Sequence, residues 1–130
     1  MIRTADTTER DGRPLSVLPP TLTEPKPGSA ATFLYRTAAF VARPESTESC
    51  LAAIDALVRH AACHEPRTAF IGSFQDAADP SSFLLILVFE DVAAERAHDR
   101  SPARQRFEKE IDALSVVGLR RRAWRPGAGL

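Results

Sequence analysis

The sequence predicts an α+β domain in which four strands form one antiparallel sheet with helices on one face. Two observations carry this prediction. The apolar residues alternate between strand-like runs and helical periodicity in the order strand, helix, strand, strand, helix, strand. Proline, glycine and helix-capping residues stand at the boundaries between these runs. This order is that of the ferredoxin-like β-α-β-β-α-β arrangement, with the second helical region broken in two.

The size and charge of the chain indicate one domain without a general attraction to polyanions. Its 130 residues are enough for a single hydrophobic core. Lys plus Arg and Asp plus Glu number 17 each, so the net charge provides no field that would collect nucleic acid or an anionic membrane. The longest apolar run is far below the roughly 18 residues of a membrane-spanning helix, and the N-terminus lacks the apolar stretch of a secretory signal. We expect a cytoplasmic protein.

Residues 1–31 are predicted to form an arm that precedes the domain of residues 32–125. The segment LPPTLTEPKPGSAA cannot form a helix interior or a central strand, because proline lacks a backbone donor. The arm is either flexible and extended, or anchored to the domain or to a partner subunit by its apolar side chains. Residues 126–130 form a short tail. The apolar side chains of the arm are Leu15, Val17, Leu18 and Leu22.

The first half of the domain is predicted to be a strand, a helix and a second strand. TFLYRTAAFVA, residues 32–42, is apolar and aromatic, as strands are. Pro44 then opens a helix whose apolar stripe continues to about Cys63. Pro66 ends this helix, and RTAFIGSFQ, residues 67–75, is the second predicted strand.

The second half is predicted to be two strands separated by a broken helix. SFLLILVFE, residues 82–90, is the third strand. Asp91 can cap a short helix that ends near Asp99. Ser101 followed by a proline is a typical N-cap and first-turn pair for the next helix. SVVGLRRRAW, residues 115–124, is the last strand.

The cysteines and histidines of the first helix indicate neither a disulfide nor a metal site. Cys50 and Cys63 are thirteen residues apart on one helix, or roughly 20 Å, which is beyond the reach of a disulfide. His60 and His64 are one turn apart, but no second cluster completes a metal site. We therefore expect reduced cysteines and no metal.

The third strand predicts a partner subunit. Helices cover only one face of a ferredoxin-like sheet, so a central strand of a monomer should alternate apolar and polar residues. In residues 82–90 both faces are apolar, and several such side chains left in water would form a large exposed apolar patch. A second, identical subunit related by a two-fold axis would cover this patch, so we expect a homodimer.

Three segments resemble the antibiotic biosynthesis monooxygenase (ABM) family of dimeric α+β barrels. They are TAAFVARPE in the first strand, the loop DPSSF, and above all FLLILVFEDVAAERAHDRSPARQRF. The last is similar to the family pattern of aromatic strand, acid, Ala-rich turn, Ala-His, serine and phenylalanine. The resemblance covers residues 32–125.

The resemblance implies an enzyme that needs no cofactor and no metal. Members include oxygenases that act on anthrones, quinols and other phenols of polyketide pathways, and other members degrade haem or isomerise small molecules. A small aromatic ligand would lie between sheet and helices, where the protein orients it, excludes water and accepts its proton before O₂ reacts. Anthrone-oxidising members carry an asparagine and a tryptophan at the positions of Tyr35 and Phe89.

His98 and Tyr35 are the candidate catalytic residues. The ordinary pKa of histidine suits a base near neutral pH, and His98 lies one turn after Ala94, on the side of its helix that should face the sheet. Alternatively, His98 caps the C-terminus of this helix by bonding a carbonyl. Tyr35 is either a proton-transfer group or an amphipathic core residue.

Four residues are candidates for binding a substrate: Arg36, Ser73, Phe89 and Trp124. The guanidinium could hold an oxyanion or carboxylate, the hydroxyl could donate one hydrogen bond, and the two aromatic rings could stack on a flat ligand. Each also has a structural interpretation, as a surface or core residue. In the last strand Arg120 and Arg122 share a face opposite Arg121, and we interpret this cluster as a barrel rim or as ion pairs to the partner subunit.

Three functions stay open at this point. The first is a cofactor-independent oxygenase of secondary metabolism that acts on a phenol, anthrone or quinol. The second is a polyketide cyclase or isomerase on the same barrel, and the third is a non-catalytic ligand-binding or auxiliary barrel. A closed cavity of about 300 Å³ or more would favour an enzyme, and a filled interior would favour the third function.

Overall fold

The structure is a computed structural model that describes residues 33–129. The arm that we expect over residues 1–31 lies outside the described residues. The elements follow the predicted order, and their ends agree with the predictions to within two residues except at the first helix, where Pro44 opens a 3-10 turn instead of the helix itself. They are β1 (Leu34–Ala42), the 3-10 turn η2 (Pro44–Ser46), α1 (Thr47–His64), β2 (Thr68–Gln75), β3 (Ser82–Phe89), α2 (Val92–Arg100), α3 (Pro102–Leu114) and β4 (Ser115–Trp124).

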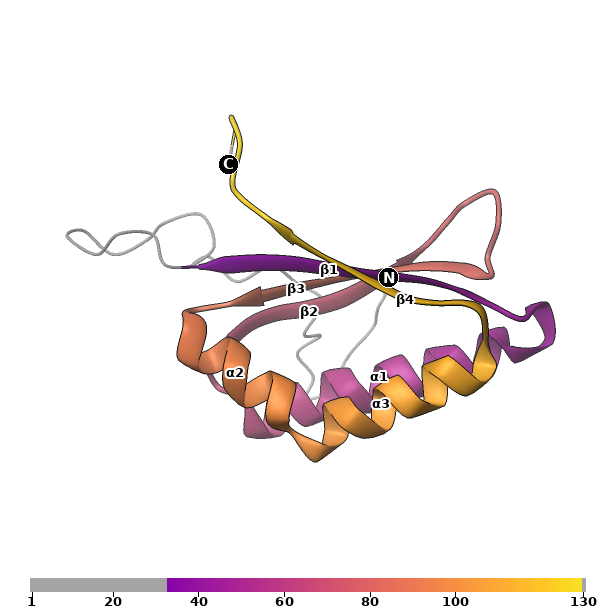
Figure 1. The fold of residues 1–130 in the computed structure, drawn as a ribbon, viewed down its shortest axis with the longest axis horizontal. Coiled ribbons are helices and arrows are strands. Elements are labelled where there is room, and N and C mark those ends of the chain that lie inside the picture. Colours follow the sequence, from indigo (N-terminus) through magenta and orange to yellow (C-terminus); the bar gives the residue numbers. More distant parts are fainter. Residues whose placement is uncertain (1–32, 130) are drawn as a thin grey trace.

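The four strands form one antiparallel sheet in the order β2-β3-β1-β4. The helices α1, α2 and α3 all lie on the same side of this sheet, as Figure 1 shows. The predicted fold class, an α+β domain of the ferredoxin-like type, is therefore confirmed. None of the described helices is long and apolar enough to cross a membrane.

Two predicted caps position the helical segments that follow β3. The Asp91 carboxylate accepts a hydrogen bond from the backbone N–H of Ala94 at 2.9 Å and so begins α2. The Ser101 hydroxyl accepts one from the N–H of Arg104 at 3.1 Å and begins α3. Because Ser101 both ends α2 and caps α3, the two helices meet at a single residue. Both caps satisfy donors that helix starts leave unpaired.

The core lies between the sheet and the helices. Alternate side chains of β3 point into it and are at most 5% exposed, as expected from the period of two of a strand. They pack on apolar side chains of α1 and α3, and this burial provides the main stabilisation of the fold. The β3 residues are Phe83, Leu85, Leu87 and Phe89, and the helix residues include Ile54, Leu57, Phe107 and Ile111.

The opposite side of the sheet, which we call the open face, carries a second and smaller apolar cluster. Phe70 and Val88 are buried in it, whereas Leu84 and Phe74 are 37% and 57% exposed. The Phe70 ring lies against Gly72, where an added Cβ would be 2.6 Å from the ring. The described helices leave this face uncovered (Figure 1).

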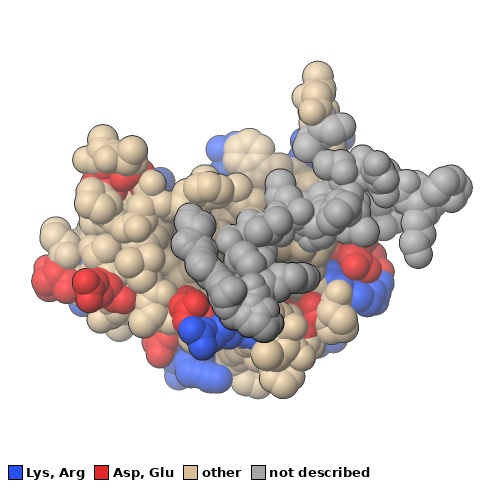
Figure 2. Space-filling view, turned by 180° about the vertical axis from the view of Figure 1, so that it is seen from behind, with Lys and Arg blue, Asp and Glu red and all other residues tan. Residues whose placement is uncertain are grey.

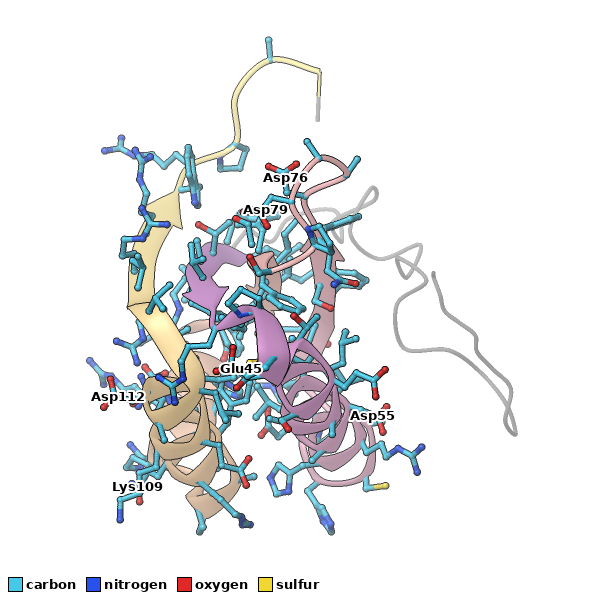
Figure 3. All side chains as sticks on the ribbon, turned by 90° about the vertical axis from the view of Figure 1, so that its right-hand side faces the viewer. Glu45, Asp55, Asp76, Asp79, Lys109 and Asp112 are labelled. Carbon is cyan, nitrogen blue, oxygen red and sulfur yellow. The ribbon has the colours of Figure 1, made fainter. Side chains whose placement is uncertain are left out.

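Charged side chains lie mainly on the outer surface of the helical layer and in the loops. Asp55 on α1 and Lys109 on α3 point away from the sheet, and Asp76 and Asp79 lie in the loop between β2 and β3 (Figure 3). Both signs of charge are interspersed over the described residues of the face in Figure 2. This distribution agrees with a chain of zero formal net charge.

Candidate active site

His98 lies in the last turn of α2 and points into the space between helices and sheet. It is 1% exposed, and its ring contacts the ring of Phe89 with centroids 5.2 Å apart. The ring Nδ1 is 2.9 Å from Oε1 of Glu65, so its partner is a carboxylate and not the backbone carbonyl of a capping histidine. The sheet-facing orientation follows from the spacing of Ala94 and His98, the two buried residues of α2.

Glu65 was not among the candidates from the sequence. It follows the last residue of α1, and its Oε1 accepts a hydrogen bond from the Thr68 hydroxyl at 2.8 Å in addition to the contact with His98. Oε2 is buried, has no hydrogen-bond partner among the described residues and lies 3.4 Å from Nε2 of His60. Burial acts to raise the pKa of Glu65, but the hydrogen bonds and charges of His98, Thr68 and His60 outweigh it, so this pKa lies below its ordinary value.

This pairing fixes the orientation of the histidine. An ionised carboxylate can only accept hydrogen bonds, so Nδ1 of His98 carries the hydrogen and donates it to Glu65. In the neutral ring Nε2 is then the unprotonated nitrogen that can accept a proton. A carboxylate on Nδ1 also stabilises the imidazolium that results. The pairing therefore gives His98 a defined tautomer and a defined orientation.

His98 lines a cavity of about 30 Å³ between the sheet and α3. This volume is room for about one water molecule, and it is far below the roughly 300 Å³ of a typical ligand pocket. The walls are apolar on the side of the core and charged at the outer rim. The apolar side chains include Leu57, Leu85, Leu87, Phe107 and Leu119, and the charged ones are Arg36, Arg104, Glu108 and Arg121.

Arg36 is a fixed part of the wall. Its guanidinium lies over the Phe89 ring at 5.2 Å, and its two terminal nitrogens bond Glu95 at 3.1 Å and Asp99 at 2.9 Å on α2. Burial acts to raise the pKa of Asp99, but hydrogen bonding and charge from Arg36, with a smaller contribution from Arg104, hold this pKa below its ordinary value. Arg36 therefore connects the sheet to the helix that carries His98.

Glu108 connects two further arginines at the rim. Its Oε2 is 2.6 Å from a terminal nitrogen of Arg104 and also contacts Arg121 on β4. Burial, together with the charges of Arg104 and Arg36, lowers the pKa of Arg121. We interpreted the arginine run of the last strand as a rim or as bonds to a partner, whereas Arg121 forms an ion pair within its own chain. No sequence signal marked Arg104 or Glu108, because their pairing depends on how α3 lies against β4.

The candidate residues Tyr35, Ser73 and Trp124 neither contact His98 nor line its cavity. Tyr35 packs on the open face with Phe70, and Trp124, its register neighbour on β4, donates from Nε1 to the Thr37 hydroxyl at 2.8 Å. Ser73 is half-buried on β2 and does not line the cavity. The structure thus brings together His98, Arg36 and Phe89, and it places Tyr35, Ser73 and Trp124 elsewhere. Among the residues that the structure describes, no group of His, Cys, Asp and Glu side chains could hold a metal ion.

The fold and this site define the class of the protein: a single ferredoxin-like α+β domain with a histidine–carboxylate pair between its sheet and its helices. The family model for antibiotic biosynthesis monooxygenase (ABM) matches residues 33–110, which is more than half of the chain. The protein belongs to this family.

Solved structures share the fold of this chain. A protein of Pseudomonas aeruginosa is 25% identical with a TM-score of 0.67, over 78% of this chain and 100% of its own. One of Mycobacterium tuberculosis is 17% identical with a TM-score of 0.66, over 73% and 95%. One of Lactobacillus acidophilus NCFM is also 17% identical with a TM-score of 0.63, and this chain spans 73% of its own length but only 44% of that longer protein. A search of the curated proteins finds no match.

Proposed function

We propose that the protein is a cofactor-independent monooxygenase of secondary metabolism that oxidises a phenol, an anthrone-like compound or a quinol with O₂. The observation that carries the proposal is the buried His98–Glu65 pair at the wall of a cavity, in a chain of the ABM family. Such a reaction begins when a base removes a proton from an electron-rich ring.

In this mechanism Nε2 of His98 takes the proton of a substrate hydroxyl, and Glu65 stabilises the imidazolium. The substrate anion passes electrons to O₂, one oxygen atom forms a bond to ring carbon, and the other leaves as water with two hydrogens of the substrate. A quinol thereby becomes a hydroxylated quinone, so the substrate loses four electrons and O₂ gains them. The apolar wall keeps water from the reacting anion.

The proposal includes a homodimer that pairs through the open face. Leu84 is 37%, Trp124 48% and Phe74 57% exposed there. Exposed aromatic and aliphatic side chains on one sheet face are typical of a subunit interface. A second copy would cover this face by the two-fold symmetry that most homodimers use.

Two observations favour other functions of the same domain. The cavity of about 30 Å³ favours a non-catalytic auxiliary barrel, because a ring-sized ligand needs a larger space. The base formed by His98 and Glu65 also suits a cyclase or isomerase, which moves a proton without using oxygen.

Oxygen uptake with methylhydroquinone, with 2,5-dihydroxybenzoate and with dithranol, an anthrone, separates these functions. Uptake above the protein-free rate that falls at least about tenfold in His98→Ala is the expected result. His64→Ala is the matched control, since His64 is exposed on α1, and circular dichroism checks that both variants fold. No uptake by the wild type removes the oxygenase proposal. Substrate conversion under nitrogen would favour the isomerase instead.

A further inference from the structure

We propose that the substrate carries a carboxylate, which binds Arg104 and Arg121 in the place that Glu108 occupies in this structure. The ligand is a small aromatic acid with one ring. This inference rests on the proposed function, from which we take the ring to be a phenol or quinol. The carboxylate site itself is tested by measuring binding, without measuring activity.

The rim of the cavity already holds a carboxylate between two guanidinium groups. Oε2 of Glu108 contacts terminal nitrogens of both Arg104 and Arg121, which come from α3 and β4. The planar guanidinium fork matches a carboxylate, and its remaining N–H groups can hold the second oxygen of a ligand. Glu108 itself thus shows which chemical group the two arginines accept.

Of the three arginines at the cavity, Arg104 and Arg121 are the ones that can change partner. Both terminal nitrogens of Arg36 are bonded to Glu95 and Asp99, so its charge is already compensated on α2. Among the residues that the structure describes, Glu108 provides the ion pair of Arg121, and Arg104 has in addition a 3.9 Å contact to Asp99 and a bond to a backbone carbonyl. When Glu108 turns away, two adjacent cations face the cavity and favour an anion there.

Glu108 is also the side chain whose movement can enlarge the cavity. Its side chain is 29% exposed and is held by ion pairs, whereas Leu85 and Leu87 are at most 5% exposed within the core. Partly exposed ion pairs contribute little to stability, so Glu108 can exchange them for water at small cost.

The size of the cavity limits the ligand to one ring. Benzene fits an apolar cavity of about 150 Å³, and the present volume is about 30 Å³. Because the carboxylate of the ligand takes the place of Glu108, a single ring also requires the cavity walls at Phe107 and Leu119 to move apart. A polycyclic anthrone would require the core to separate from the helices, so this inference narrows the proposed substrates to phenols and quinols with one ring.

Calorimetric titration under nitrogen tests the inference with two probes of the same shape. The first is 2,5-dihydroxybenzoate, a quinol with a carboxylate, and the second is its neutral amide, 2,5-dihydroxybenzamide. We expect the wild type to bind the acid about tenfold more tightly than the amide, because charged hydrogen bonds to the arginines are lost with the amide. Arg121→Gln removes this preference. Arg122→Gln, whose guanidinium lies over Trp124 on the open face, leaves it unchanged.

Glu108→Gln distinguishes a ligand site from a structural ion pair. If Glu108 occupies the place of the ligand, its neutral variant binds the acid about three- to tenfold more tightly and the amide as before. If Glu108 only holds α3 to β4, the variant melts at a lower temperature and binds the acid no better, and the inference is overturned. Equal affinity for the two probes, or no binding of either at millimolar concentration, also overturns it. If the wild type binds 2,5-dihydroxybenzoate but takes up no oxygen with any probe, the proposed oxygenase is refuted and the carboxylate site is still supported.

Discussion

Replacement of Glu65 by glutamine should lower stability through loss of charge alone. Glutamine keeps the shape of the side chain, but it turns a charged acceptor of two buried partners, His98 and Thr68, into a neutral one. Hydrogen bonds to charged groups contribute about 1.5–3 kcal/mol and neutral ones about 1 kcal/mol. We therefore expect Glu65→Gln to lower the free energy of unfolding by about 2 kcal/mol at pH 7. Urea unfolding followed by circular dichroism measures this quantity.

The effect should depend on pH in a defined direction. The pKa of Glu65 is lower in the folded protein than its ordinary value of 4.5, so the folded state binds fewer protons than the unfolded chain. The stabilisation is therefore complete above about pH 4.5 and is lost as the pH falls through the folded pKa. The difference in stability between wild type and Glu65→Gln should shrink accordingly between pH 6 and pH 3. The other carboxylates are present in both proteins, so their contributions to the pH dependence of stability cancel in this difference.

The exposed Glu110 on α3 provides the matched control. Glu110→Gln should change the free energy of unfolding by less than about 0.5 kcal/mol at either pH. An unchanged stability of Glu65→Gln at pH 7, or a loss that is the same at pH 7 and pH 3, would show that Glu65 is not an ionised partner of His98.

Three further substitutions test the fold and the proposed dimer. Ser101→Ala removes the cap on the N–H of Arg104 and should cost about 1 kcal/mol in thermal or urea unfolding. Gly72→Ala places a Cβ 2.6 Å from the Phe70 ring, which must move, so we expect a loss of about 1–3 kcal/mol in urea unfolding. Leu84→Lys puts a charge on the open face and should convert a dimer into a folded monomer in light scattering.

Each of these changes has a control of the same type. Ser49→Ala alters an exposed serine of α1 and should leave stability within about 0.5 kcal/mol. Gly118→Ala would bring its Cβ no nearer than 3.6 Å to Asp112, an ordinary contact, so it should be tolerated. Leu51→Lys changes an equally exposed leucine on α1 and should keep the dimer. A monomeric wild type, or a dimeric Leu84→Lys, would refute pairing through the open face.

The fold could be predicted from the sequence because it depends on the spacing of apolar residues within each strand and helix and on the residues that cap the helices. The two apolar faces of β3, the caps Asp91 and Ser101 and the bounds of β4 are all properties of neighbouring residues. The period of two in a strand could also have separated Tyr35 from Arg36, since adjacent residues of β1 point to opposite faces.

The site could be predicted only in part, because its partners are distant in the chain. The orientation of His98 follows from one helical turn, but its carboxylate lies 33 residues earlier, at the end of another helix. The rim likewise joins Arg104 and Glu108 on α3 to Arg121 on β4. Such contacts depend on how the helices lie against one another and against the sheet, and charged residues carry no periodic signal that reveals this arrangement.

The anchoring of α2 has a consequence for the pair of His98 and Glu65. This helix buries only Ala94 and His98, of which His98 bonds Glu65, and its remaining contacts include the ion pairs of Glu95 and Asp99 with Arg36. Helices with few buried apolar contacts open locally at low free energy. His98, which we propose for proton transfer, is thus also one of the two buried side chains that attach α2 to the rest of the domain. Local opening of α2 would separate His98 from Glu65, so the proton transfer that we propose requires this helix to be in place.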